Sequence, residues 1–441
     1  MNELLIVISG FILSVGSYIV WPSRKNIIAH VRLGFSITSL IVPVYLANVL
    51  STYNSTLISQ YAQISIIGSL FYLFGMYLGF TYKLSAKRLF KDVASEILNE
   101  NALNYIKRYV PILTIFGILL MLVCFIGMGF IPAFSSDPFQ AKFFRGDYKD
   151  AYQPFAFPYR VSYQIISLCS VINLAVFLIS RKNIYLMLAF LCSAFLFLTL
   201  TRGPMIYALI LFFGCLSIFY RKWFWPYILF IVLIYPFGSL FYLIFGTIFG
   251  IDQFTKIYDV TSIWNSIASG APDITDQLNF LKGFNGLGGN LTYGKTYFGG
   301  LIPYNFFWNP AVYSLYIVNN GLMDISSLGS GGVRVGLPLW GYSSFSWLGV
   351  VFTSLISGTF WGMGTKVIKQ ITNIVSKTSF SKEYKAGLLL FSIVVYENVF
   401  RLFSDFYTSS LYGIASLSIV LFLLYGNRFS VSRLRGKLKV K

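Results

Sequence analysis

Charged residues beside long apolar runs are the first candidates for chemistry in this sequence. Arg202 stands in a short turn, 201–204, between two such runs, which places it just beneath the outer headgroups if both runs cross a membrane. Its guanidinium group has five fixed N–H donors, a geometry suited to bidentate binding of phosphate or pyrophosphate. The alternative is an arginine that reaches toward lipid headgroups, and the sequence leaves both interpretations open.

Glu397, Arg401 and Asp405 form a second candidate group at the end of another apolar run. They follow one another at intervals of four residues, so a helix that continues to Asp405 would carry all three on one face. Such a row predicts either the polar wall of an active cavity or a ladder of salt bridges that satisfies itself. We take Glu397, Arg401 and Asp405 as the candidate catalytic residues.

Long apolar segments must position these charged residues. The chain has 441 residues, of which 56% are hydrophobic and 11% charged, and its mean hydropathy is +0.70. A soluble protein carries about 25% charged residues, so the composition excludes a water-soluble enzyme. We predict a single all-α polytopic integral membrane domain over residues 1–441. Its eleven predicted membrane spans are 3–21, 33–50, 61–82, 109–130, 159–180, 184–200, 204–220, 224–250, 346–365, 386–400 and 410–426.

Basic residues are concentrated in alternate links between these spans. Most of the 34 lysines and arginines fall at 24–32, 83–108, 181–182, 221–222, 366–385 and 428–441, whereas most acidic residues fall in the other links. By the positive-inside rule the basic links are cytoplasmic, Arg32 included. We therefore predict an external N-terminus and a cytoplasmic C-terminus. The net charge of +19 then reflects topology and contact with membrane lipids, and we expect no nucleic-acid partner.

Two external links, 131–158 and 251–345, are much longer than the others. The first holds Lys142 and Arg145 among aromatic residues, and the second has seven glycines between 281 and 300. Links of this length are usually functional, and glycines permit both motion and close approach to a ligand. We expect 251–345 to act as a mobile lid that swings Arg334 over an outward-facing cavity. A rigid cap over the helix ends is the alternative.

The sequence offers no obvious metal or cofactor site. All four cysteines lie inside predicted spans, the single histidine, His30, falls on the cytoplasmic side, and no Asp-x-Asp pair occurs. Asp147 with Asp150 and Asp273 with Asp276 are the external acid pairs that remain as magnesium candidates. We expect a protein that needs no metal and no cofactor.

Three stretches resemble, in their order and topology, the Wzy-type polymerases that join oligosaccharide repeat units into O-antigen and related bacterial surface polysaccharides. They are TRGPM after a span, YGKTYFGGLIPYNFFWNP in the long link, and VGLPLWGYSSFSWLGVVFTSLISG entering the next span. The resemblance implies a GT-C-like membrane glycosyltransferase in the bacterial inner membrane, with its active site facing the periplasm. Candidate substrate-binding residues are then Arg202, Arg145 and Arg334, as external arginines, and Lys295 and Tyr297 in the second stretch.

The resemblance also implies the reaction and its partners. A glycan on undecaprenyl pyrophosphate would be transferred from its reducing end to the non-reducing end of a new lipid-linked repeat unit; whether a chain-length regulator binds stays open. Arginines would neutralise the pyrophosphate leaving group, and a single displacement at the anomeric carbon would invert its configuration. Without an external histidine, a carboxylate must act as the base. The candidates are Asp259, Asp273, Asp276, Asp324, Glu397 and Asp405, of which we favour Glu397.

Two other functions compete with this prediction. An O-antigen ligase has a similar layout, but ligases typically carry an external-loop histidine, which this chain lacks. A flippase or other transporter of lipid-linked oligosaccharides would also be polytopic with arginines in a cavity. Transporters commonly show two similar halves, and no repeat between halves is evident here.

Overall fold

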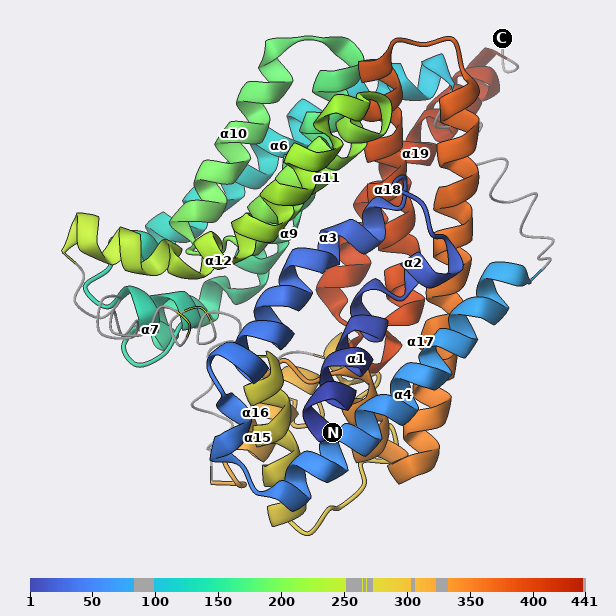
Figure 1. The fold of residues 1–441 in the computed structure, drawn as a ribbon. Coiled ribbons are helices and arrows are strands. Elements are labelled where there is room, and N and C mark those ends of the chain that lie inside the picture. The colour runs from blue at the N-terminus through green and yellow to red at the C-terminus, as the bar shows by residue number, and fades with distance from the viewer. Residues whose placement is uncertain are drawn as a thin grey trace.

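The computed structural model describes residues 1–82, 99–250, 264, 267, 273–302, 306–322 and 332–438. These residues form helices and no β-strand, which confirms the all-α prediction (Figure 1). The α-helices are α1 (Asn2–Val15), α2 (Ser17–Val20), α3 (Ile27–Ser36), α4 (Ser55–Thr81), α6 (Glu100–Met128), α7 (Pro138–Phe143), α8 (Tyr148–Tyr152), α9 (Ala156–Ser180), α10 (Asn183–Leu198), α11 (Gly203–Phe219), α12 (Phe224–Phe249), α15 (Asp273–Gly286), α16 (Pro310–Val318), α17 (Leu337–Lys377), α18 (Lys382–Ser404) and α19 (Leu411–Leu438). A π-helix, η1 (Ile37–Leu46), continues α3, and short 3-10 turns such as η8 (Phe406–Thr408) join other helices.

Apolar helices of membrane length dominate the chain. Within the described residues, six helical segments are long and apolar enough to cross a membrane: Ile27–Leu46, Ser55–Thr81, Glu100–Met128, Tyr148–Ser180, Leu337–Lys377 and Lys382–Ser404. Four shorter apolar helices accompany them: Asn2–Val15, Asn183–Leu198, Gly203–Phe219 and Leu411–Gly426. The protein is therefore an α-helical polytopic membrane protein.

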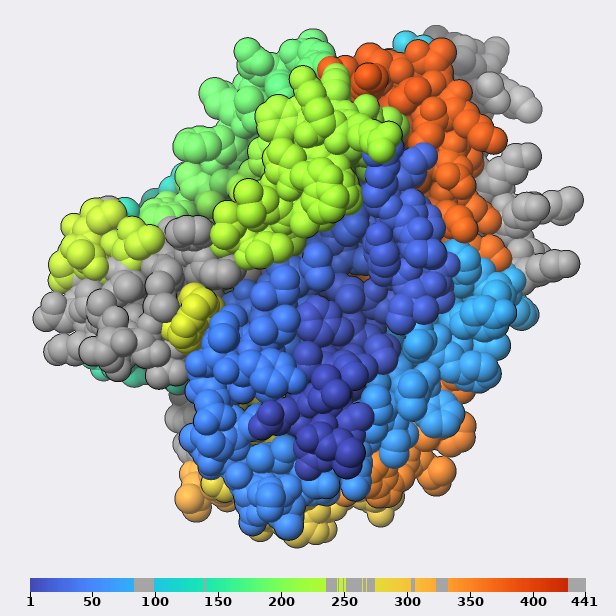
Figure 2. All heavy atoms as spheres, viewed as in Figure 1, coloured from blue at the N-terminus to red at the C-terminus, as the bar shows by residue number. Residues whose placement is uncertain are grey.

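The helices form two groups joined along α9 and α18. Figure 1 shows α4 lying along α17, with α1 and α3 beside them, while α6, α10 and α11 gather around α9, and α12 packs against α3 and α11. In the space-filling view of Figure 2 the blue N-terminal helices cover the lower near face, and the green atoms of α11 lie above them. The N-terminus lies at the end that carries α15 and α16, and the C-terminus lies at the opposite end (Figure 1).

Four glycines bring the backbones of α4 and α17 into direct contact. Gly75 and Gly79 on α4, and Gly358 and Gly362 on α17, each follow the Gly-x-x-x-Gly spacing of close-packed membrane helices. A Cβ atom on Gly79 would lie 1.9 Å from the carbonyl oxygen of Thr359. Neither backbone can retreat without separating the helices, so these positions require glycine.

We predict that Gly358→Val destabilises the fold by about 3 kcal/mol or more, at the upper end of overpacking costs. A Cβ atom on Gly358 would lie 2.1 Å from the carbonyl oxygen of Tyr72, which belongs to the backbone of α4. Thermal unfolding of the purified protein in detergent would measure the effect. Gly413→Val is the matched control, because a Cβ atom on Gly413 would meet no heavy atom within 4 Å. Equal melting temperatures for the two variants would contradict the prediction.

The helix α17 is bent back on itself near its start. Phe345 and Ser346 leave the helical conformation, and Ser346 has φ 56° and ψ −142°, a region that glycine alone adopts readily. The bend brings Gly341 so close to Gly349 that a Cβ atom on Gly349 would lie 2.0 Å from the carbonyl oxygen of Gly341. The backbone N–H groups of Thr292 and Tyr293 donate to the carbonyl oxygens of Ser343 and Ser344. These two carbonyl groups therefore keep hydrogen-bond partners although the helix is interrupted.

The second long link, 251–345, is helical over part of its described length. That range contains α15, α16 and the first arm of α17. Its glycine-rich part is packed against the bend, with Thr292 and Thr296 buried. Packing of this segment against neighbouring helices, rather than a strong helical pattern of its own, accounts for its structure.

Candidate functional site

A cavity of about 740 Å³ lies where the two long links meet the helices. Lys142 and Phe144 come from the first link, Gly300, Asn309 and Arg334 from the second, and other walls from α9, α17, α18, the start of α19 and the turn that holds Thr199 and Thr201. Among the described residues that line it are four cations, Lys142, Arg160, Arg334 and Arg401, and no carboxylate. This cationic cavity is suited to a ligand with several negative charges.

Lys142 reaches the cationic cavity from the short helix α7. Asp137 caps this helix by accepting a hydrogen bond from the backbone N–H of Gln140. After the helix, Phe144 adopts φ 50° and stacks on Tyr152 with ring centroids 3.7 Å apart. Burial, together with the positive charges of Arg202 and Arg334, lowers the pKa of Lys142 to about 7. Two further positive charges, on Arg202 and Arg334, therefore act on Lys142 in this part of the cavity.

We predict that the titration of Lys142 makes binding of inorganic pyrophosphate to the cationic cavity about tenfold weaker at pH 8 than at pH 6. This figure is the difference that remains after the pH dependence of a Lys142→Met variant has been subtracted. Lys142 with a pKa near 7 is mostly charged at pH 6 and mostly neutral at pH 8. An anion binds the charged form, so binding at pH 8 must take up a proton. Calorimetric titration in two buffers of different ionisation enthalpy would measure both effects. The same pH dependence in Lys142→Met would contradict the role of Lys142.

Arg160 and Arg401 enter the cationic cavity from two neighbouring helices, α9 and α18. The Nε–H of Arg160, on α9, donates to the hydroxyl of Tyr152 at 2.8 Å, and its guanidinium lies 5.4 Å from the ring centroid of Tyr412. Arg401 lines the cavity, and 68% of its side-chain surface is exposed. Arg160 was not predicted as a site residue, because its signal in the sequence is only that of an arginine at the start of an apolar span.

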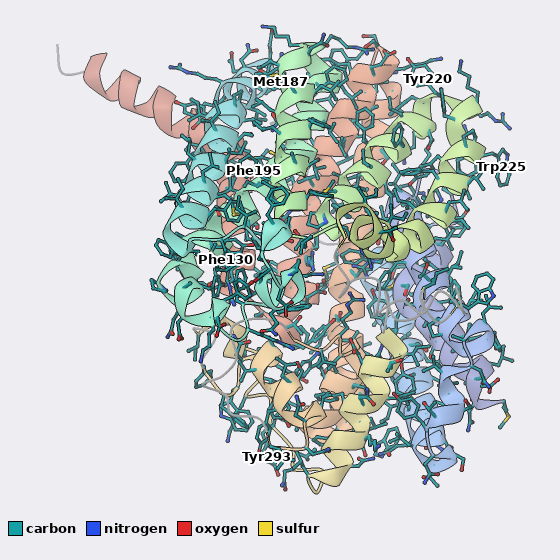
Figure 3. All side chains as sticks on the ribbon, turned by 90° about the vertical axis from the view of Figure 1, so that its left-hand side faces the viewer. Phe130, Met187, Phe195, Tyr220, Trp225 and Tyr293 are labelled. Atoms are coloured by element: carbon teal, nitrogen blue, oxygen red, sulfur yellow. The ribbon has the colours of Figure 1, made fainter. Side chains whose placement is uncertain are left out.

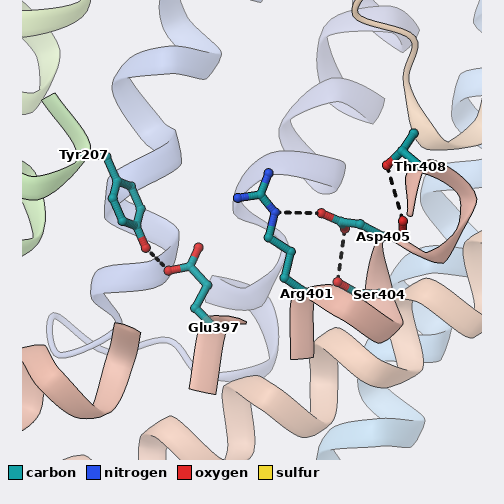
Figure 4. Close-up of polar contacts among 6 residues, drawn as sticks. All are labelled: Tyr207, Glu397, Arg401, Ser404, Asp405 and Thr408. Atoms are coloured by element: carbon teal, nitrogen blue, oxygen red, sulfur yellow. Dashed lines mark hydrogen bonds and ion pairs between the residues drawn. The ribbon is translucent and has the colours of Figure 1, made fainter. Parts of the chain in front are cut away.

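Arg401 is held by Asp405, which ends α18. The Nε–H of Arg401 donates to Oδ2 of Asp405 at 3.1 Å, and the hydroxyl of Ser404 donates to Oδ1 at 3.1 Å (Figure 4). Asp405 lines a second cavity, of about 190 Å³, bounded by α1, α3, α4 and α17. The Arg401–Asp405 pair therefore belongs to the wall between the cationic cavity and this polar cavity.

The polar cavity is lined by Arg32, a charged residue that was predicted to lie elsewhere. Arg32 was expected in a cytoplasmic link, but it lies inside α3 and lines the polar cavity together with Asp405. Its guanidinium stacks on Trp361, 4.8 Å from the ring centroid. The expectation was wrong because Arg32 follows the basic residues Arg24 and Lys25 so closely that the apolar span was predicted to begin after it. Hydroxyl groups supply much of the remaining lining: Ser9, Ser14, Ser39, Ser65, Ser357, Ser404, Tyr61, Tyr72 and Tyr407.

Glu397 takes a different place from its two partners in the sequence pattern. It accepts a hydrogen bond from the hydroxyl of Tyr207, on α11, whereas Arg401 turns toward Asp405 (Figure 4). Glu397 does not occur among the described residues that line the two cavities. Of the candidate bases whose side chains the structure describes, Asp276, Glu397 and Asp405, it is Asp405 that contacts Arg401 and lines the polar cavity.

The two arginines predicted from the first link and the short turn lie near the cationic cavity. Arg202 forms the N-cap of α11, its neighbour Thr201 lines the cavity, and its charge acts on Lys142. Arg145 is half-buried, and its guanidinium lies 5.3 Å from the ring centroid of Phe143. Arg145 is not among the described lining residues, although the nearby Lys142 is.

The remaining candidates come from the second long link. Arg334 already lines the cationic cavity, so no swinging motion is needed to bring it there. Lys295 is exposed and stacks on Trp308 at 4.8 Å, and Tyr297 is buried, with its hydroxyl 2.8 Å from that of Thr353. Neither is among the described residues that line the cationic cavity.

Among the candidate carboxylates of the second link, Asp276 has a described side chain, and this side chain contacts the cavity-lining Arg334. The backbone N–H of Arg334 donates to Oδ2 of Asp276 at 3.3 Å, and burial raises the pKa of Asp276. Asp259, Asp324 and the side chain of Asp273 lie outside the described residues.

The described side chains provide no set of three histidine, cysteine or acidic groups placed to hold a metal ion. The cationic cavity can instead bind a polyanion through fixed guanidinium and ammonium groups, beside a carboxylate that can accept a proton. Comparison of the chain with protein-family models, with curated proteins and with solved structures found no match.

Proposed function

We propose that this protein is a GT-C-like glycosyltransferase that polymerises undecaprenyl-pyrophosphate-linked oligosaccharide repeat units into a bacterial surface polysaccharide. The observation that carries the proposal is the convergence of Lys142, Arg160, Arg334 and Arg401 on one cavity between apolar helices. A pyrophosphate on a lipid tail requires this combination, because its charge must be neutralised while its tail stays in the bilayer.

The proposed mechanism is a single displacement at the anomeric carbon of the donor. The cations of the cavity hold the donor pyrophosphate, and the acceptor hydroxyl attacks the anomeric carbon from the opposite face. Its oxygen forms the new glycosidic bond, the bond from carbon to the pyrophosphate oxygen breaks, and undecaprenyl pyrophosphate leaves with the electron pair. Asp405 accepts the proton of the acceptor hydroxyl from the side of the polar cavity, which Asp405 lines, while Arg401 faces the donor pyrophosphate and orients Asp405 through the 3.1 Å contact. This route inverts the anomeric configuration.

The proposed topology has eleven spans, a periplasmic N-terminus and a cytoplasmic C-terminus in the bacterial inner membrane. Each predicted span overlaps an apolar helix or helix pair of the structure. The two chain ends lie at opposite ends of the molecule, as an odd number of crossings requires (Figure 1). The cationic cavity draws on both long links that the positive-inside rule assigns to the periplasm.

Purified protein in detergent, given only lipid-linked repeat units, would test the proposed activity. We expect a ladder of longer lipid-linked glycans, each one repeat unit longer than the last. No ladder with competent substrate would overturn polymerisation. Transfer of glycan to a lipid A core would indicate a ligase, and movement of unchanged substrate across proteoliposomes would indicate a flippase.

We predict that EDTA leaves the polymerisation rate within about twofold of the untreated rate. The cations that neutralise pyrophosphate in the proposed mechanism are side chains, whereas magnesium sites usually need one or two carboxylates as well as phosphate oxygens. Loss of activity in EDTA, restored by added magnesium, would contradict this prediction. The residual carboxylate pairs, Asp147 with Asp150 and Asp273 with Asp276, would then be the first to replace with asparagine.

A further inference from the structure

A third cavity, of about 520 Å³, lies between α9, α11, α12 and the start of α18. Most of its lining is apolar, contributed by Phe177, Leu178, Phe212, Phe213, Leu216 and Phe230. Its rim carries Tyr220, and Figure 3 shows Tyr220 at the end of the molecule opposite Tyr293, which belongs to the second long link. This apolar pocket therefore lies far from the end that the second link covers.

Positive charge surrounds the mouth of the apolar pocket. Arg181 and Lys222 line it, and Nζ of Lys382 lies 5.2 Å from the ring centroid of Tyr220. One carboxylate, Glu383, is among the described lining residues; it pairs with Nη2 of Arg181 at 2.9 Å and accepts a hydrogen bond from Tyr220. The three cations outnumber this single carboxylate, so the mouth keeps a net positive charge.

Tryptophans mark the depth of the mouth in the membrane. Trp223, which lines the pocket, and Trp225, two residues later, are 54% and 75% exposed. Trp225 projects from the outer edge of the molecule in Figure 3. Exposed tryptophans beside lysine and arginine are typical of the headgroup layer. The mouth then lies at headgroup level, and the apolar interior lies at the depth of the acyl chains.

We propose that this pocket binds an anionic phospholipid, with one acyl chain among the apolar side chains and the phosphate held at the mouth by Lys222 and the neighbouring cations. Charge complementarity selects the occupant: a basic pocket between membrane helices on the cytoplasmic side matches an anionic headgroup. Apolar burial alone would accept any acyl chain, so the cations are what distinguish anionic from zwitterionic lipid. The site is separate from the cationic cavity and does not depend on the proposed polymerase activity.

Native mass spectrometry of the full-length protein in detergent would test the lipid site, with phosphatidylglycerol and phosphatidylethanolamine of identical acyl chains as probes. We expect one phosphatidylglycerol to bind at least fivefold more tightly than phosphatidylethanolamine. Lys222→Gln should remove most of this preference, because Lys222 is exposed at the mouth. Leu216→Trp should weaken binding of both lipids by filling the pocket.

Two control variants make the result specific to this pocket. Lys377→Gln removes an exposed lysine at the end of α17, and Leu119→Trp adds an indole to an exposed position of α6. Both should bind phosphatidylglycerol like the unchanged protein. Equal affinity for the two lipids, or equal losses in test and control variants, would overturn the proposal. Displacement of bound phosphatidylglycerol by millimolar inorganic phosphate would show that the headgroup alone binds, and would overturn the acyl-chain part.

Discussion

Arg401→Ala is expected to lower the initial rate of polymerisation by about 100-fold or more, the usual cost of removing one electrostatic stabiliser from an active site. Arg401 presents an open guanidinium to the cationic cavity and orients Asp405, so its loss removes pyrophosphate neutralisation and leaves the base unheld. Arg401→Lys should recover little, because an ammonium lacks the guanidinium fork. The rate would be measured as the growth of the glycan ladder from lipid-linked units.

Arg108→Ala is the matched control for Arg401→Ala. Arg108 is an exposed arginine on α6 whose guanidinium lies 5.7 Å from the ring centroid of Tyr109. We expect this variant to keep its full rate. Thermal unfolding should show that Arg401→Ala remains folded, which separates a chemical loss from a structural one. A folded Arg401→Ala protein with more than half of the original rate would remove Arg401 from the mechanism.

Arg202→Ala is the second variant for which we expect a loss of about 100-fold, with normal expression. Arg202 caps α11 beside the cavity-lining Thr201 and helps to lower the pKa of Lys142. We expect Arg202 to grip the donor pyrophosphate with two N–H donors, so Arg202→Lys should also stay nearly inactive.

A pH profile separates this role of Arg202 from a structural one. Removing the Arg202 charge should raise the pKa of Lys142 above 7, because that charge is one of the causes of its lowered value. Pyrophosphate binding by Arg202→Ala should therefore be weaker overall but should stay constant to a higher pH. Arg202→Lys retains the charge and should keep the original profile. Full polymerisation in Arg202→Lys would count against bidentate binding.

Hydropathy predicted the helices well because it depends on local composition. The span expected at 346–365 begins where α17 bends, at Phe345 and Ser346. The pattern of basic residues gave a wrong span boundary where a charged residue lies inside a helix of membrane length. Arg32 was assigned to a link by its basic neighbours, although Trp361, more than 300 residues later, shelters it.

The cationic cavity could not be predicted as a unit from the sequence. Arg202 and Arg401 were found as charges beside apolar runs and Arg334 as an arginine of the second long link. That Arg334 and Arg401 line one cavity, with Arg202 close enough to act on Lys142, depends on how distant segments pack. The glycine contacts of α4 with α17 show the same limit, because a Gly-x-x-x-Gly spacing does not name its partner helix. α15 and α16 were missed because a glycine-rich link has little helical pattern of its own. Contacts with other parts of the fold stabilise these two helices instead.

The shared wall between the cationic cavity and the polar cavity has a thermodynamic consequence. Arg401 faces the first cavity and Asp405 the second, and a single contact of 3.1 Å joins them. An anion that draws the Arg401 guanidinium toward itself leaves more negative charge on the other side, near Arg32. Occupancy of the two cavities is then coupled by a free energy that must be equal in both directions. A polar group that binds beside Arg32 and Asp405 will change the affinity of the protein for the anion by some factor. The anion will change the affinity of the protein for that polar group by the same factor.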